Sequence, residues 1–168
     1  MREEFALPGM RRGAVVTVGT FDGVHRGHSL VLDRTAAQAH DRGMSAVAVT
    51  FAPHPLEIVN PSAAPPLLTS WDEKIEVLAQ GPIDYVAVVP FTQQLASYTA
   101  EEFVEHVLIG RFCMKELLIG HDHGFGRGRA GDVESLRMIG RRRGFPVDVV
   151  QAVLGSDGAP ISSTSIRR

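Results

Sequence analysis

Two histidines stand three residues apart in the segment GTFDGVHRGH, which covers residues 19–28. A β-branched run precedes this segment and a helical pattern follows it, so we expect it to lead from a strand into the first turn of a helix. His25 and His28 would then share one face of that turn. Free amides at a helix start favour bound phosphate, and paired imidazoles can donate hydrogen bonds to a phosphoryl group during its transfer. The segment therefore predicts phosphoryl chemistry, with Gly27 leaving room for a nucleotide.

A surface role, a metal pair and a nucleotide-binding glycine loop each fit this part of the sequence less well. A single histidine near a helix start is more often a surface or capping residue, but here the spacing, the glycines and the strand-to-helix context favour function. A metal pair is disfavoured because histidines at this spacing lack an obvious third ligand nearby. A P-loop kinase or GTPase is disfavoured because the GxxxxGK[ST] pattern is absent. Residues 126–131 fit GxGxxG, but these glycines begin six residues after the expected strand end, which disfavours a dinucleotide-binding turn.

The elements that must position these groups alternate along the chain. Short, nearly continuous apolar runs indicate strands that are covered on both faces. Longer segments with helical spacing lie between them, and this alternation predicts an α/β fold with an open parallel sheet. Ligands of such sheets bind beyond the carboxyl ends of the strands. We expect strands at residues 14–19, 45–51, 85–90, 116–120 and 147–153, helices at residues 27–42, 70–79, 99–108 and 132–143, and a loop at residues 58–68.

Composition narrows the class of protein. The 168 residues allow one domain, and 44% hydrophobic with 21% charged residues is ordinary globular composition. A net charge of -2 makes bulk nucleic-acid binding a poor expectation. The single cysteine, Cys113, excludes an internal disulfide and a cysteine-rich zinc site. We expect no membrane partner and a cytoplasmic protein, because no apolar run approaches ~20 residues and the first residues do not resemble a signal peptide.

Five motifs, in order, carry a resemblance to a known family. The HRGH at residues 25–28 resembles the signature of the HxGH nucleotidylyltransferases, and the longer segment 19–28 is similar to the N-terminal adenylyltransferase module of prokaryotic FAD synthetases, the bifunctional riboflavin kinase/FMN adenylyltransferases. The resemblance covers essentially the whole chain and implies a Rossmann-like open parallel sheet with helices on both faces. The other matching segments are TFAPHP (50–55), PF (90–91) with AEEF (100–103), GHDHGFG (120–126) with GD (131–132), and ISST (161–164) with IR (166–167).

The resemblance also implies a reaction. Such enzymes join FMN to the AMP part of ATP, giving FAD and pyrophosphate, with Mg²⁺ and without a covalent enzyme intermediate. Mg²⁺ would bridge phosphate oxygens and keep several waters, so we assign it no protein ligand. We assign catalytic roles to His25, His28 and Arg167. We assign ATP or FMN contacts to Gly19, Thr20, Phe21, Asp22, Gly27, Phe51, Pro53, His54, Pro55, Asp122, Phe125, Gly126, Arg127, Arg129, Ser162, Ser163 and Thr164.

The chain departs from the family pattern in places. His123 and Gly124 stand where the family usually carries an aromatic residue and often an arginine, and Ser165 stands where an arginine is frequent. The serine-rich segment 162–164 is also compatible with a plain N-capped helix. The family's module is normally fused to a riboflavin kinase domain, which we expect to be absent here. We therefore expect residues 1–168 to adenylylate FMN and not to phosphorylate riboflavin.

Two alternatives stay open. The first is an HxGH nucleotidylyltransferase that acts on a smaller phosphate, such as pantetheine phosphate, nicotinamide mononucleotide or glycerol phosphate. The second is a non-catalytic remnant that binds nucleotide or flavin without turnover.

Overall fold

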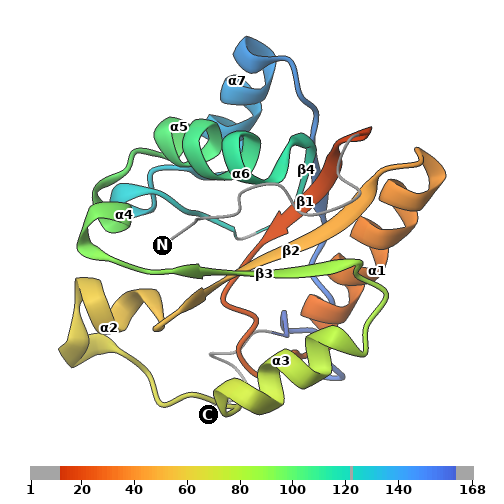
Figure 1. The fold of residues 1–168 in the computed structure, drawn as a ribbon. Helices are drawn as coiled ribbons and strands as arrows, with labels where there is room; N and C mark the ends of the chain where they lie inside the picture. The colour runs from red at the N-terminus through yellow and green to blue at the C-terminus, as the bar shows by residue number, and fades with distance from the viewer. Residues whose placement is uncertain (1–11, 122, 162–168) are drawn as a thin grey trace.

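A five-stranded parallel sheet organises the computed structural model, which describes residues 12–121 and 123–161. The strand order is β3-β2-β1-β4-β5, so β1 is central and the chain reverses its direction of growth between β1 and β4 (Figure 1). This confirms the predicted α/β fold with a Rossmann-like open sheet. The strands are β1 (Ala14–Val18), β2 (Ser45–Ala52), β3 (Tyr85–Pro90), β4 (Met114–Gly120) and β5 (Val147–Val150).

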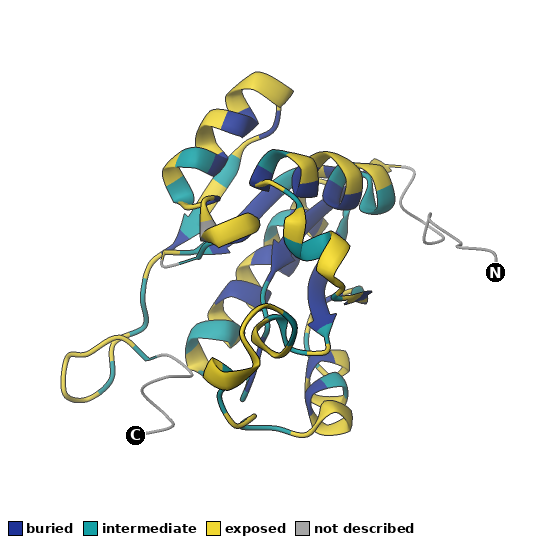
Figure 2. Ribbon diagram, turned by 90° about the vertical axis from the view of Figure 1, so that its left-hand side faces the viewer, coloured by how far each residue is buried: buried dark blue, intermediate teal, exposed yellow. Residues whose placement is uncertain are grey.

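Helices cover both faces of the sheet, and each face has its own apolar core. Alternate β1 side chains point to opposite faces. Val15 belongs to the core cluster with the helices at residues 26–41 and 71–79, and Val16 belongs to the cluster with the helices at residues 100–109 and 133–143. Figure 2 shows the buried residues along the strands and on the inner sides of the helices. The long helices are α1 (Arg26–Asp41), α3 (Trp71–Ala79), α7 (Val133–Arg143) and the continuous run α5 (Ala100–Phe103), η3 (Val104–Ile109) and α6 (Gly110–Phe112).

Short helices replace part of a predicted loop. The sequence predicts that residues 58–68 are irregular, but α2 (Pro55–Val59) and η2 (Pro61–Ala63) occupy their first half. The cause is an unusual cap: His54 Nδ1 accepts from the Leu56 amide at 3.1 Å, while Glu57 accepts from the His54 amide at 3.2 Å. Histidine is not among the preferred capping residues, so the sequence pattern does not indicate this helix start. Two further short helices are α4 (Gln93–Ser97) and η4 (Arg127–Arg129).

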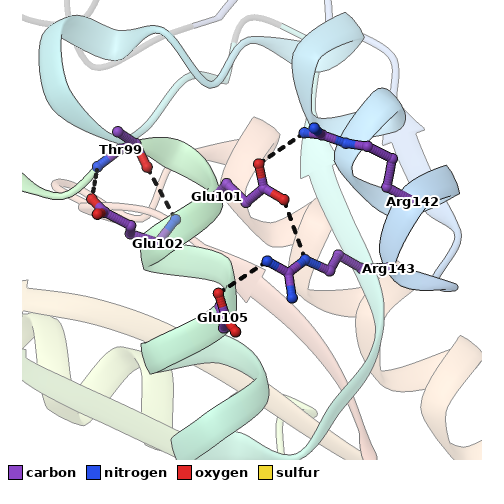
Figure 3. A network of polar contacts seen from close by, with 6 residues as sticks. All are labelled: Thr99, Glu101, Glu102, Glu105, Arg142 and Arg143. Atoms are coloured by element: carbon purple, nitrogen blue, oxygen red, sulfur yellow. Dashed lines mark hydrogen bonds and ion pairs between the residues drawn. The ribbon is translucent and has the colours of Figure 1, made fainter.

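Side-chain contacts hold the α5 start against α7. A capping box, predicted from the sequence, joins Thr99 and Glu102 through bonds of 2.8 and 3.2 Å. One residue away, Glu101 pairs with Arg142 at 2.9 Å and with Arg143 at 3.2 Å (Figure 3). Arg143 also pairs with Glu105 at 3.0 Å, and these partners raise its pKa. Exposed pairs contribute at most about 1 kcal/mol each, so the network mainly fixes how the two helices are aligned.

Two capping carboxylates predict acid sensitivity of the fold. Hydrogen bonds from Ser70 lower the pKa of Glu73, and hydrogen bonds from Ser135 lower the pKa of Asp132. A carboxyl group whose folded pKa lies below its unfolded value stabilises the fold above the unfolded value and loses that effect as the pH falls through the folded one. We expect Asp132→Asn to reduce the fall in Tm between about pH 5 and pH 3. Thermal unfolding measures this.

The control for that experiment is Asp33→Asn, which changes an exposed carboxylate in the middle of α1. It should leave the pH dependence of Tm as in the wild type. An unchanged acid transition in Asp132→Asn would contradict the assigned cap.

Among residues 12–121 and 123–161, no helix combines the length and the apolarity that crossing a bilayer demands.

Candidate active site

A cavity of about 770 Å³ opens at the carboxyl edge of the sheet. Segments that follow all five strands line it, represented by Gly19, His54, Phe91, His121 and Gln151. Its volume is within the ~300–1,000 Å³ typical of small-molecule sites. The cavity spans the point between β1 and β4 where the chain reverses direction, which is where open parallel sheets bind ligands.

The paired histidines stand at the start of α1. His25 is the N-cap of the helix and His28 belongs to its first turn, so the predicted common face is confirmed. Their rings stack, with centroids 3.7 Å apart and planes inclined by 22°. The Phe21 ring meets His28 edge-on, with centroids 5.3 Å apart. Both imidazoles line the cavity beside the amides of the helix start, which favour anionic groups.

Gly27 allows this stack to form. A Cβ at that position would lie 3.1 Å from two atoms of the His25 ring and 3.5 Å from the Ile161 carbonyl oxygen. A side chain there would crowd the His25 ring, whereas its contact with the Ile161 carbonyl would be an ordinary one. Ile161 lines the cavity and is the last described residue, so the predicted roles of Ser162, Ser163, Thr164 and Arg167 fall outside the described ranges, as does that of Asp122.

Aromatic side chains form another wall of the cavity. Phe51 and Phe91 meet edge-on with centroids 5.4 Å apart, and Phe103 and Phe125 lie 4.9 Å apart. All four line the cavity, although Phe51, Phe103 and Phe125 also belong to the core. A wall of this kind suits a planar, largely apolar ring system. The cavity thus combines a helix start of the kind that favours phosphate with a surface of the kind that suits an aromatic ligand.

Comparison with known proteins agrees with this combination. A sequence model of the FAD synthetase family matches residues 8–165. The chain belongs to the FAD synthetase family. Among curated relatives, the bifunctional riboflavin kinase/FMN adenylyltransferase of Escherichia coli (strain K12) is 37% identical over 158 residues. That alignment covers 94% of this chain and 50% of the relative, so the chain spans about half the length of the curated relative.

Solved structures share the fold. A macrolide-efflux protein from Streptococcus pneumoniae matches with a TM-score of 0.78 and 25% identity, covering 97% of this chain and 55% of that one. Pantoate-beta-alanine ligase from Francisella tularensis, in complex with beta-gamma ATP and beta-alanine, matches with a TM-score of 0.65 and 13% identity, covering 94% and 66%. At that identity the second likeness concerns the fold alone.

The loop after β4 shows why this FAD synthetase family member has glycines there. A Cβ on Gly126 would lie 2.6 Å from the Ala100 backbone nitrogen, and one on Gly131 would lie 2.7 Å from the Ala100 side chain. The Arg127 amide donates to the Tyr98 carbonyl at 2.8 Å. The first and last glycines of the GxGxxG pattern therefore reflect close packing on the start of α5, whereas a Cβ on the middle one, Gly128, would meet open space. Arg127 lines the cavity, and Arg129, two residues further along the chain, ends η4.

Histidines are concentrated at the cavity. Of the seven in the chain, His25, His28, His54, His121 and His123 line it. His123 occupies a departure from the family pattern, and its ring meets Phe125 edge-on at 5.3 Å. Within the described ranges, no group of three or more histidine, cysteine or acidic side chains could hold a metal ion.

Most of the predicted contact residues that the structure describes meet at the cavity, but Asp22 and Pro53 are not part of its lining, and the side chain of Arg129 lies outside what the structure describes. The Asp22 carboxylate instead accepts from the backbone amides of Leu68 and Thr69, at 2.9 and 3.3 Å. Pro53 lies in the turn before α2, outside the cavity lining. Ligand contact by these two residues stays a prediction. The predicted residues that line the cavity are Gly19, Thr20, Phe21, His25, Gly27, His28, Phe51, His54, Pro55, Phe125, Gly126 and Arg127.

Several residues that line the cavity have no role predicted from the sequence. Phe91 and Phe103 lie in segments that carry the family resemblance, yet the sequence gives neither a site role. Leu95 follows β3 in α4, and Gln151 follows β5 directly. The position just after a predicted strand is the signal that could have identified Phe91. Gln151 was missed because the predicted strand 147–153 runs past the observed end of β5 at Val150.

Proposed function

We propose that this chain catalyses adenylyl transfer from ATP to FMN, giving FAD and pyrophosphate. The observation that carries the proposal is the stacked His25 and His28 pair at the helix start, facing a cavity with an aromatic wall. Membership of the FAD synthetase family supports it. The aromatic wall distinguishes FMN from smaller phosphate substrates, which need no surface for a tricyclic ring. The single cysteine suits a reducing compartment, and we place the activity in the cytoplasm.

The reaction needs positioning and charge stabilisation. An oxygen of the FMN phosphate attacks the α-phosphorus of ATP, a new P–O bond forms, and the bond from the α-phosphorus to the bridging oxygen breaks as pyrophosphate leaves. No covalent enzyme intermediate is required. The amides at the start of α1 and the imidazoles of His25 and His28 stabilise the negative charge on the α-phosphate and on the leaving pyrophosphate. Stabilisation of developing charge by fixed donors is usually the largest single contribution to catalysis.

Further polar and aromatic groups complete the proposed site. Arg127 at the cavity, together with Arg129 and Arg167, would hold the phosphates, and Ser162, Ser163 and Thr164 would supply further hydroxyl donors. Mg²⁺ would enter with ATP and would neutralise part of the charge on its phosphates, and we assign it no ligand among the described residues. The Phe51 and Phe91 rings and the His54 to Pro55 segment would contact the isoalloxazine ring.

The direct test supplies alternative acceptors to the purified protein with ATP and Mg²⁺. We expect FAD and pyrophosphate with FMN, and background pyrophosphate with pantetheine phosphate or nicotinamide mononucleotide. Faster turnover of either smaller phosphate would favour the other nucleotidylyltransferase activity. Binding of FMN and ATP without FAD formation would instead indicate a non-catalytic remnant.

A second expectation concerns riboflavin. We propose that residues 1–168 form an adenylyltransferase domain without kinase activity, because they correspond to half of relatives whose names include both activities. With riboflavin, ATP and Mg²⁺, no FMN should appear by chromatography, whereas FMN given in parallel should be converted to FAD. Detection of FMN from riboflavin would refute this proposal.

A further inference from the structure

The segment between β1 and α1 adopts a strained backbone. Phe21 has a φ of +49° and Val24 a φ of +32°, although neither is glycine. Such conformations are unfavourable for residues other than glycine and persist only where the surroundings hold them. The Phe21 ring is 2% exposed and meets the His28 imidazole edge-on. The position of the His28 ring therefore depends on the backbone conformation of this segment.

Side chains from distant elements hold the segment in place. The Thr20 carbonyl accepts from Lys74 Nζ at 3.1 Å and from Thr50 Oγ1 at 3.3 Å. Two residues further along the chain, the Asp22 carboxylate accepts a hydrogen bond from the Leu68 amide at 2.9 Å. One side of the strained segment is thus attached to β2, to α3 and to the chain that leads into α3.

Lys74 is an unusual residue to find in this position. It is 8% exposed, and its ammonium group lies 4.5 Å from the centroid of the Trp71 ring. Burial lowers its pKa, and the nearby negative charge of Asp22 opposes that shift. Lysine stems commonly extend to bring the charge into water, whereas this one turns inward to a single backbone carbonyl. Lys115, the only other lysine in the sequence, is exposed at the start of β4.

We propose that Lys74 is a positioning residue for adenylyl transfer, which holds the Thr20 carbonyl and thereby sets the Phe21 ring against His28. The proposal rests on the proposed function. Lys74 does not line the cavity, so it acts through the segment and not on the substrate. The inward ammonium supplies a hydrogen bond and a charge to a segment whose backbone would otherwise relax.

Lys74→Met tests the proposal, because methionine keeps an unbranched apolar stem and removes the donor. We expect kcat for FAD formation to fall between ~10-fold and ~100-fold, since a shift of about 1 Å in a reacting group can cost that much. The KM for FMN should change less than threefold, because the aromatic wall is untouched. Lys115→Met is the matched control and should keep wild-type kcat. A kcat for Lys74→Met within twofold of the wild type would overturn the proposal.

Combination with His28→Ala separates positioning from general destabilisation. If Lys74 acts through His28, the double variant should be no slower than His28→Ala alone, since residues that act as a unit are not additive. If the fold-loss of kcat in the double variant equalled the product of the two single losses, Lys74 would act independently of His28, and this would overturn the proposal. Should Lys74→Met fail to fold, Thr50→Val removes the other donor to the same carbonyl, and its kcat is measured and interpreted in the same way. Lys74→Arg, which retains a cation and donors, should recover part of kcat.

A readout without catalysis distinguishes this proposal from the proposed function. The NMR signals of the His28 imidazole, assigned by their loss in His28→Ala, should shift in Lys74→Met and stay in place in Lys115→Met. If the wild-type protein makes no FAD but these signals shift, the proposed function fails and only the positioning of the His28 ring by Lys74 stands. If FAD forms and the signals do not shift, the positioning role fails alone.

Discussion

Replacement of His28 by alanine is expected to slow FAD formation by about 10²- to 10³-fold, the effect of removing one preorganised donor from a site of developing charge. His28 lies in the first turn of α1, stacked on His25 and lining the cavity. The FMN affinity should change far less, because the aromatic wall that would contact the flavin comes from other elements. Steady-state kinetics and an FMN titration measure the two quantities separately.

His40→Ala is the matched control for this experiment. His40 lies near the end of the same helix, exposed, and pairs with Asp84 at 3.0 Å, far along α1 from the cavity lining. Its loss should leave kcat unchanged. If His28→Ala turned over at the wild-type rate, the role given to the histidine pair would be wrong, whatever the affinity for FMN.

Gly126→Ala should disturb the loop after β4 more than any similar change within it. Its φ is +80°, and a Cβ there would lie 2.6 Å from the Ala100 nitrogen and 2.8 Å from the Ala100 Cα. These are backbone atoms, so no side-chain rotation can relieve the clash. Overpacking and the unfavourable φ together predict a loss of about 3 kcal/mol. For a chain of this size that corresponds to a Tm lower by roughly 6–12 °C. FMN binding should weaken as well, because Phe125 and Arg127 flank this position at the cavity.

Gly128→Ala isolates the steric part of that loss. Gly128 also has a positive φ, of +63°, but a Cβ there would meet nothing within 4 Å. It should therefore lose only the conformational part, about 1 kcal/mol. Thermal unfolding and FMN titration of both variants give the comparison. Equal losses of Tm would show that contact with Ala100 does not determine the loop.

The sequence determined the architecture and the location of the site. The apolar runs and helical segments predicted the parallel sheet, and the capping boxes at Ser70 and Thr99 are present where they were expected. The segment 19–28 carried its own signals, namely the glycines, the histidine spacing and the change from strand to helix pattern. These signals are local, because hydrophobic periodicity and caps act within a few residues. The geometry of a parallel sheet then brings the strand ends together.

Tertiary structure alone decided how the polar groups are used. The side chain of Asp22, expected at the ligand, binds the Leu68 amide 46 residues away, and Lys74, given no role from the sequence, reaches Thr20 across 54 residues. No local pattern records such pairs, because they depend on how α3 packs against the sheet. The strand order determines which loops lie at the cavity. The direction of each side chain in such a loop depends instead on the buried hydrogen-bond donor or acceptor with which it pairs.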